Sequence, residues 1–192
     1  MKLNSARQAW HDAYFMPWAQ SIEMIELGCR VQKTQHDKST SSAMHQALAG
    51  CIQRAVDTLP NYLREFGHHL YSPLAGDDDR ETAEELVYLI AYDKSGRMTA
   101  SKAERARYVA MGVVYRYRAM NQGGQGEGVD RLLAPETFRA WLDAQYGIKL
   151  NSEAWGRDWA PFVEACFDAC NDLDRQALRP VSEALKLMVE AA

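Results

Sequence analysis

The sequence predicts an all-α protein, organised as a single-domain bundle of about seven helices with no sheet. Apolar residues recur at three- and four-residue steps along nearly the whole chain, and no alternating strand pattern persists. The chain of 192 residues is 47% hydrophobic and 25% charged, which is typical of a globular protein that buries one core. We find no internal repeat.

The first predicted helix begins near Ser5. Aromatic, aliphatic and thiol side chains share one of its faces: Trp10, Tyr14, Trp18, Ile22, Ile25 and Cys29. Pro17 is expected to bend this helix or divide it in two. Residues 33–42 are polar and have no apolar period, so they are predicted to form a connecting loop.

A second helix is expected to start at Ser41 or Ser42 and to end or kink at Pro60. A short helical segment is expected after Pro60, and Gly67, Pro73 and Gly76 are expected to interrupt it. A third helix follows from about Arg80, with Leu86, Leu89 and Ile90 expected to face inward. Acidic residues in its first turns complement the helix dipole.

The following helix is predicted to open with a capping box formed by Ser101 and Glu104. A glycine-rich, flexible loop is predicted over residues 121–128. The next helix has Pro135 at its first position and Gly147 at its end. Two further helices are predicted over residues 151–173 and 175–192, and each contains a proline.

The charge is unevenly distributed along the chain. A net charge of −4 and a pI near 5.7 exclude a generally basic coat for nucleic acid. However, residues 77–93 carry seven acidic side chains and one basic one, whereas residues 94–118 carry seven basic side chains and one acidic one. We select six basic residues as candidates for binding a polyanion: Arg97, Lys102, Arg105, Arg107, Arg116 and Arg118.

Three interpretations of residues 101–120 remain open. At about 100° per residue, tyrosines 108 and 115 share an arc that is flanked by two stripes of arginines. In one interpretation this is a central helix, whose arginine stems lie along neighbouring helices and whose charges meet acids such as the preceding acidic block. In another, the arginines bind phosphates and the tyrosines stack on bases. An acidic protein partner is the third.

Candidate metal ligands are sparse. Glu65 and His68 have the Glu-x-x-His spacing of di-iron sites, but the second such motif that those sites need is absent. A pair of histidines, His68 and His69, in a loop or at a helix end is the preferred interpretation. Cys166 and Cys170 are four residues apart on an apolar stripe, so we expect core thiols. We therefore predict no metal and no cofactor.

A helix-turn-helix could be drawn from Thr137 to Phe162. Its second helix offers one arginine, Arg157, beside two acids, which is a poor set for base recognition. Trp155 and Trp159 are four residues apart and are interpreted either as core residues or as an anchor for a partner. The motif is therefore weak.

No catalytic motif is present, so we expect a protein that acts by binding; an enzyme built from distant residues would be tested first at Glu65, His68 and His69. The leading hypothesis is a non-enzymatic accessory regulator of bacterial or phage type, contacting nucleic acid or the transcription machinery through the six basic residues. The alternative is a protein–protein interaction module, such as an immunity protein or inhibitor, using Asp77, Asp78 and Asp79 or exposed Trp155 and Trp159.

We expect a cytoplasmic location and no contact with a membrane. The four cysteines lack the spacing of a disulfide scaffold, and the N-terminus does not resemble a signal peptide. No apolar run approaches the ~20 residues needed to span a bilayer. A homo-oligomer is compatible with this pattern, because helix faces that form a core could also form a dimer seam.

Overall fold

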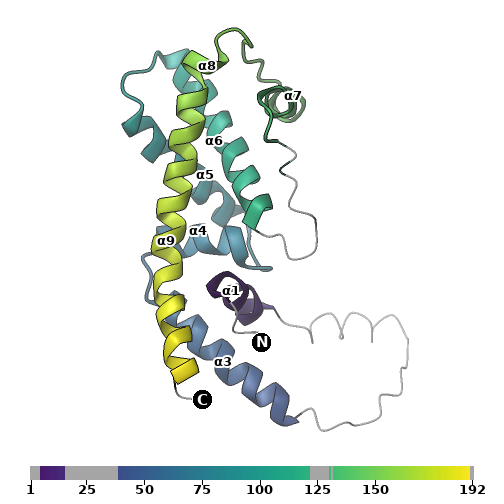
Figure 1. Ribbon diagram of the computed structural model, residues 1–192, viewed down its shortest axis with the longest axis vertical. Helices are drawn as coiled ribbons and strands as arrows, with labels where there is room; N and C mark the ends of the chain where they lie inside the picture. Colours follow the sequence, from purple (N-terminus) through teal and green to yellow (C-terminus); the bar gives the residue numbers. More distant parts are fainter. Residues whose placement is uncertain (1–4, 16–38, 122–129, 131, 191–192) are drawn as a thin grey trace, which may run out of the picture. The chain divides into compact units, whose positions relative to one another are not determined.

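The computed structural model describes residues 5–15, 39–121, 130 and 132–190. These residues form eight α-helices and no strand (Figure 1), which confirms the predicted all-α class. The helices are α1 (Ala6–Tyr14), α3 (Ser39–Asp57), α4 (Asn61–Tyr71), α5 (Asp77–Lys94), α6 (Ala100–Asn121), α7 (Pro135–Tyr146), α8 (Trp155–Asp158) and α9 (Ala160–Glu190).

The chain packs into two compact units. The first contains α1, α3, residues Tyr71–Leu74 and α9 from residue 178 onward. The second contains α4 up to Leu70, helices α5 to α8, and α9 up to residue 177. The single-domain organisation of the whole chain stays a prediction.

In the first unit, α1 packs against α3. The Ser5 hydroxyl accepts a hydrogen bond from the backbone N–H of Gln8 at 3.2 Å, so the helix starts where the sequence predicts. Trp10 is fully buried, and its ring centroid lies 6.2 Å from that of Tyr71. Residues 16–38 lie outside the described residues, and with them the predicted bend at Pro17.

Two expectations about the next helices are wrong. Helix α3 begins at Ser39, so residues 39–42 are helical and not part of a loop; hydroxyl residues are favoured near helix N-termini as well as in loops, and composition did not separate the two. Helix α4 runs through Gly67 without interruption. A helical glycine costs about 1 kcal/mol, and burial of the neighbouring Phe66 and Leu70 outweighs that cost.

Helix α5 begins at Asp77, one turn earlier than predicted. The carboxylate of Asp79 accepts the backbone N–H of Gly76 at 2.9 Å and closes the first turn. The buried side of the helix is set by residues four apart, including Ala83, Val87 and Ala91. Leu89 was expected to face inward, but it lies about 200° around the helix from Val87 and is 51% exposed.

Helix α6 occupies a central position in the second unit. It packs against α5 and α7, and the Tyr117 hydroxyl donates to Asn171 at 3.2 Å and to the buried Asp174 at 3.1 Å, both on α9 (Figure 1). This packing places α6 at the centre of the unit, as the first interpretation expects, and the use of its arginines stays a prediction. Its buried residues are Ala106, Val109, Ala110, Gly112, Val113, Val114 and Tyr117.

The predicted capping box at the start of α6 is wrong. The hydroxyl of Thr99 lies 3.4 Å from the backbone nitrogen of Lys102, and the helix begins at Ala100, directly after Thr99. Ser101 is therefore already inside the helix. Both Thr99 and Ser101 are capping residue types, and only the backbone path decides between them.

Helix α7 has the predicted ends, with Pro135 at its first position and Gly147 in the left-handed conformation at φ 69°. After it, α8 has four residues, and α9 is one continuous helix in which Pro180 is an interior residue. The two helices predicted there are one. Pro161 lies in the first turn of α9, where proline is well tolerated, and α8 before it has only four residues, so the predicted helix-turn-helix does not form.

Candidate functional site

Two of the six candidate cations are held by acids within the second unit. The Nε of Arg116 donates to Oδ2 of Asp130 at 2.6 Å. The two side chains are only 12% and 14% exposed. The Nζ of Lys102 lies 3.7 Å from Oδ1 of Asp158 and 5.6 Å from the centre of the Trp159 ring. Arg116 therefore stabilises the fold and is poorly placed to bind a ligand, and Lys102 is directed toward Asp158 and the Trp159 ring.

Arg107 is paired with Glu85, and its guanidinium lies 4.4 Å from the centre of the Tyr88 ring. Glu85 belongs to the acidic segment that precedes the basic one, so the expected pairing between these segments is confirmed for this residue. The two side chains are 51% and 45% exposed, and an exposed ion pair contributes only about 0–1 kcal/mol. Arg107 is therefore available to an anionic ligand at little cost.

The other three cations have no hydrogen bond or ion pair with any residue that the structure describes. Arg97 lies in the turn between α5 and α6, and Arg105 lies in the second turn of α6; both are exposed. Arg118 lies in the last turn of α6 and is half-buried, which lowers the pKa of its guanidinium. These three arginines and Arg107 are the free or releasable positive charges of the basic segment.

Four aromatic rings form a continuous row on α6 and α7. Tyr115 stacks on Trp141 with centroids 4.9 Å apart and an interplanar angle of 21°. Trp141 meets Tyr146 edge-on at 5.7 Å, and Tyr146 lies 5.3 Å from Tyr108. Tyr115 is 53% exposed and the other three are half-buried. We call Tyr108, Tyr115, Trp141 and Tyr146 the aromatic row.

Sequence reasoning selected the tyrosines of α6 but missed Trp141 and Tyr146. These two residues are five positions apart, a spacing that does not mark a single helix face. They reach the α6 tyrosines because α7 lies very close to α6 at Gly112. Burial and the nearby Glu84 carboxylate raise the pKa of Tyr146.

The acidic candidates divide into exposed and structural residues. Asp77 and Asp78 are exposed, and Asp77 lies 3.3 Å from Arg80 in a weak surface pair. Asp79 closes the first turn of α5. Of the three acidic candidates, Asp77 and Asp78 are therefore the exposed ones.

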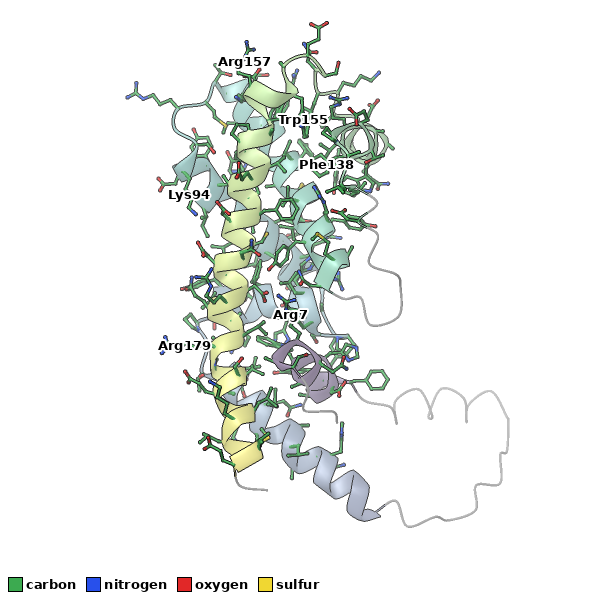
Figure 2. The ribbon with its side chains drawn as sticks, viewed as in Figure 1. Arg7, Lys94, Phe138, Trp155, Arg157 and Arg179 are labelled. Carbon is green, nitrogen blue, oxygen red and sulfur yellow. The ribbon has the colours of Figure 1, made fainter. Side chains whose placement is uncertain are left out.

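The two candidate tryptophans pack within the fold. Trp159 is 6% exposed, so the expectation of an exposed anchor is wrong for this residue, and the core alternative holds. The Trp155 ring lies edge-on to Phe138 with centroids 5.9 Å apart, and Figure 2 shows these two side chains together beside α7. Arg139 lies 5.7 Å from the centre of the Trp155 ring.

The remaining candidates form no reactive site in the part of the chain that the structure describes. No group of three or more His, Cys, Asp or Glu side chains is placed to hold a metal ion there. Cys166 and Cys170 are fully buried free thiols whose pKa is raised by that burial. Among the described helices, none is both long and apolar enough to cross a membrane.

No protein-family model matches the chain, and comparisons with curated proteins and with solved structures find no match. The functional conclusion therefore depends on the chain's own geometry. Within the described residues, that geometry combines arginines without acidic partners and exposed or half-buried aromatic rings. Such groups bind anions and flat rings without forming or breaking bonds.

Proposed function

We propose that this chain is a non-enzymatic accessory protein that binds nucleic acid through α6, with a preference for single strands. The observation that carries the proposal is the aromatic row, which exposes Tyr115 between arginines. Proteins that bind single strands combine a positively charged track for the backbone with aromatic rings on which bases stack. In this chain both features occur on one helix and its neighbour α7.

The order of residues along α6 supports this use. Arg105 lies one turn before Tyr108, and Arg118 lies one turn after Tyr115, so cations flank both tyrosines of the helix. The two arginines are separated by about 20 Å along the helix axis at 1.5 Å per residue. Arg97 extends the basic track beyond the start of α6.

Ion pairs within the fold reduce the number of candidate cations that are available to a ligand. Arg116 is paired with Asp130, and Lys102 lies beside Asp158, which Arg157 also binds. The other candidate cations are Arg97, Arg105 and Arg118, with the releasable Arg107. About three phosphate contacts to a single strand predict a slope of log K against log salt near −2. Such binding is moderate, as expected of an acidic protein.

The experiment that tests this function is a salt series of oligonucleotide binding with charge-reversed variants. Fluorescent single-stranded DNA, double-stranded DNA and RNA are titrated with wild type and with the Arg97→Glu/Arg105→Glu variant. We expect single strands to bind most tightly, and the variant to lose most of the affinity and of the salt dependence.

A matched control is available on α9 in Arg175→Glu/Arg179→Glu. These arginines are 78% and 80% exposed, each lies close to an acid on its own helix, and the control changes the net charge by the same amount. It is expected to bind like wild type. Equal loss of binding in the two variants would show that net charge alone matters and would contradict a site on α6.

A second candidate function, a protein–protein module, is favoured by the exposed acids Asp77 and Asp78 at the start of α5. Their surface complements a basic partner. If wild type binds no nucleic acid, the next experiment compares cross-linked products from nuclease-treated lysate for wild type and Asp77→Asn/Asp78→Asn. A basic protein that is cross-linked by wild type and lost in the variant would support this function.

A further inference from the structure

Two side chains of the second unit each have a buried nitrogen without a hydrogen-bond partner among the residues that the structure describes. His69, on α4, is 3% exposed, and its Nδ1 is buried without a partner. Arg118, on α6, has a buried Nε without a partner. Most buried polar atoms in proteins are hydrogen-bonded, and an unpaired one costs about 1–3 kcal/mol. Each of these two atoms can still accept or donate a hydrogen bond.

These two side chains are electrostatic neighbours. After burial, the positive charge of Arg118 is the largest influence that lowers the pKa of His69, which lies at about 4. Arg80 acts in the same direction, and Asp79 opposes it. In Figure 1 the end of α6 points toward α4, in agreement with this coupling.

We propose that Arg118 and His69 form a binding site for one oxyanion, a phosphate or carboxylate group, with Arg80 at its margin. An oxyanion accepts the Nε–H of Arg118, which is a donor only, and a hydrogen bond from the imidazole ring. The one acid that acts on His69, Asp79, already accepts the backbone N–H of Gly76. Arg118 as a whole is half-buried, whereas its Nε is buried.

The site does not rest on the proposed function. A phosphate of a nucleic acid and free phosphate present the same oxygen atoms, and either can occupy the site. Occupancy by an anion offsets the positive charges of Arg118 and Arg80, so it favours protonation of His69. A protonated imidazole donates from both nitrogens, which also gives Nδ1 a partner.

The test follows the imidazole signals of the full-length protein by NMR during titration with inorganic phosphate at low ionic strength. We expect phosphate to shift the His69 signals and to raise the pH at which this ring becomes protonated, and to increase the Tm. Arg118→Gln should weaken the phosphate-dependent shift by about tenfold or more, since a hydrogen bond to a charged group contributes roughly 1.5–3 kcal/mol.

The control is Arg105→Gln, which removes the same charge from an exposed position on the same helix. It should retain the phosphate response of wild type. The proposal is overturned if millimolar phosphate leaves the His69 signals of wild type unchanged, or if the two variants lose the response equally. Because the first result needs only wild type, the proposal stays testable even if Arg118→Gln fails to fold.

Competition then identifies the source of the anion. If a single-stranded oligonucleotide binds and phosphate displaces it while shifting His69, the site holds a nucleic-acid phosphate. If both bind together, the site holds a separate small anion. If the Arg97→Glu/Arg105→Glu variant loses the oligonucleotide but keeps the phosphate response, the two sites are independent. Loss of the phosphate response alone refutes only the oxyanion site.

Discussion

Gly112 of α6 and Phe138 of α7 lie so close that a methyl group at position 112 would be 2.9 Å from Cζ of the Phe138 ring. The absence of a side chain at this position lets α7 approach α6. The same methyl group would lie 3.2 Å from Cζ3 of Trp141. This close approach brings Trp141 and Tyr146 of α7 to the tyrosines of α6. The aromatic row therefore depends on the absence of a side chain at Gly112.

The first prediction concerns this contact. Gly112→Ala should lower the free energy of unfolding by about 1–3 kcal/mol, because overpacking outweighs the helix propensity that alanine gains. Urea denaturation measures this change, and tryptophan fluorescence should report a displaced α7. Gly50→Ala on α3 is the control, since a Cβ there meets nothing within 4 Å, and it should stabilise by about 0.5–1 kcal/mol. A stable Gly112→Ala protein with unchanged fluorescence would contradict the role of Gly112.

A second prediction distinguishes structural arginines from binding ones. Arg116→Gln should destabilise the protein by about 3–5 kcal/mol, because it leaves the largely buried carboxylate of Asp130 without its partner. Arg105→Gln should change stability by less than about 0.5 kcal/mol, because that side chain is exposed and pairs with no acid among the described residues. Thermal unfolding of both variants checks the difference. Equal, small effects would mean that Arg116 is not held by Asp130.

The third prediction concerns the hydroxyl of Tyr117 between α6 and α9. Tyr117→Phe removes the donor to Asn171 and to the buried Asp174, and should cost about 1–3 kcal/mol of stability. Tyr115→Phe is a control on the same helix, because that side chain is 53% exposed and makes no hydrogen bond with a described residue. Chemical denaturation should show a loss for the first variant only.

The fourth prediction is a pH dependence caused by His69. Burial and Arg118 lower the pKa of His69 from 6.5 to about 4, so between these values the unfolded chain binds more protons than the folded one. The stability of the folded state is therefore full above pH 6.5 and falls as the pH drops toward 4. At about 1.4 kcal/mol per pKa unit, the loss approaches roughly 3 kcal/mol.

Unfolding free energies measured from pH 7 to pH 4 in a phosphate-free buffer check this prediction. The slope should become shallower in His69→Gln, where the titrating group is absent. A wild-type protein and a variant with parallel pH profiles would show that His69 protonates as readily in the folded state as in the unfolded one.

Much of the fold was predictable because it depends on local signals. The start of α1 at Ser5, and the start and end of α7 at Pro135 and Gly147, follow from side chains that act on their own backbone. Errors arose where tertiary packing outweighs a local preference. Gly67 remains helical because its neighbours are buried, and Leu89 faces outward because the packing of α5 selects a different face.

The candidate site was less predictable than the fold. The sequence identified every cation, but it could not distinguish Arg116, held by Asp130, from Arg105, which is unpaired, since these pairings join residues that are distant in sequence. It also could not place Trp141 beside Tyr115, because that contact depends on the close approach at Gly112. The unpaired atoms of His69 and Arg118 have no sequence signal.

The measurement that tests the central claim most directly is the affinity of Tyr115→Ala for a fluorescent single-stranded oligonucleotide, compared with wild type across a salt series. We predict a loss of about 1–3 kcal/mol of binding free energy with the salt slope unchanged, because a stacking ring is removed and every cation is kept. Wild type should bind single strands more tightly than duplex. Wild-type binding that is unaffected by Tyr115→Ala, or no binding at low salt, would contradict the proposed use of α6.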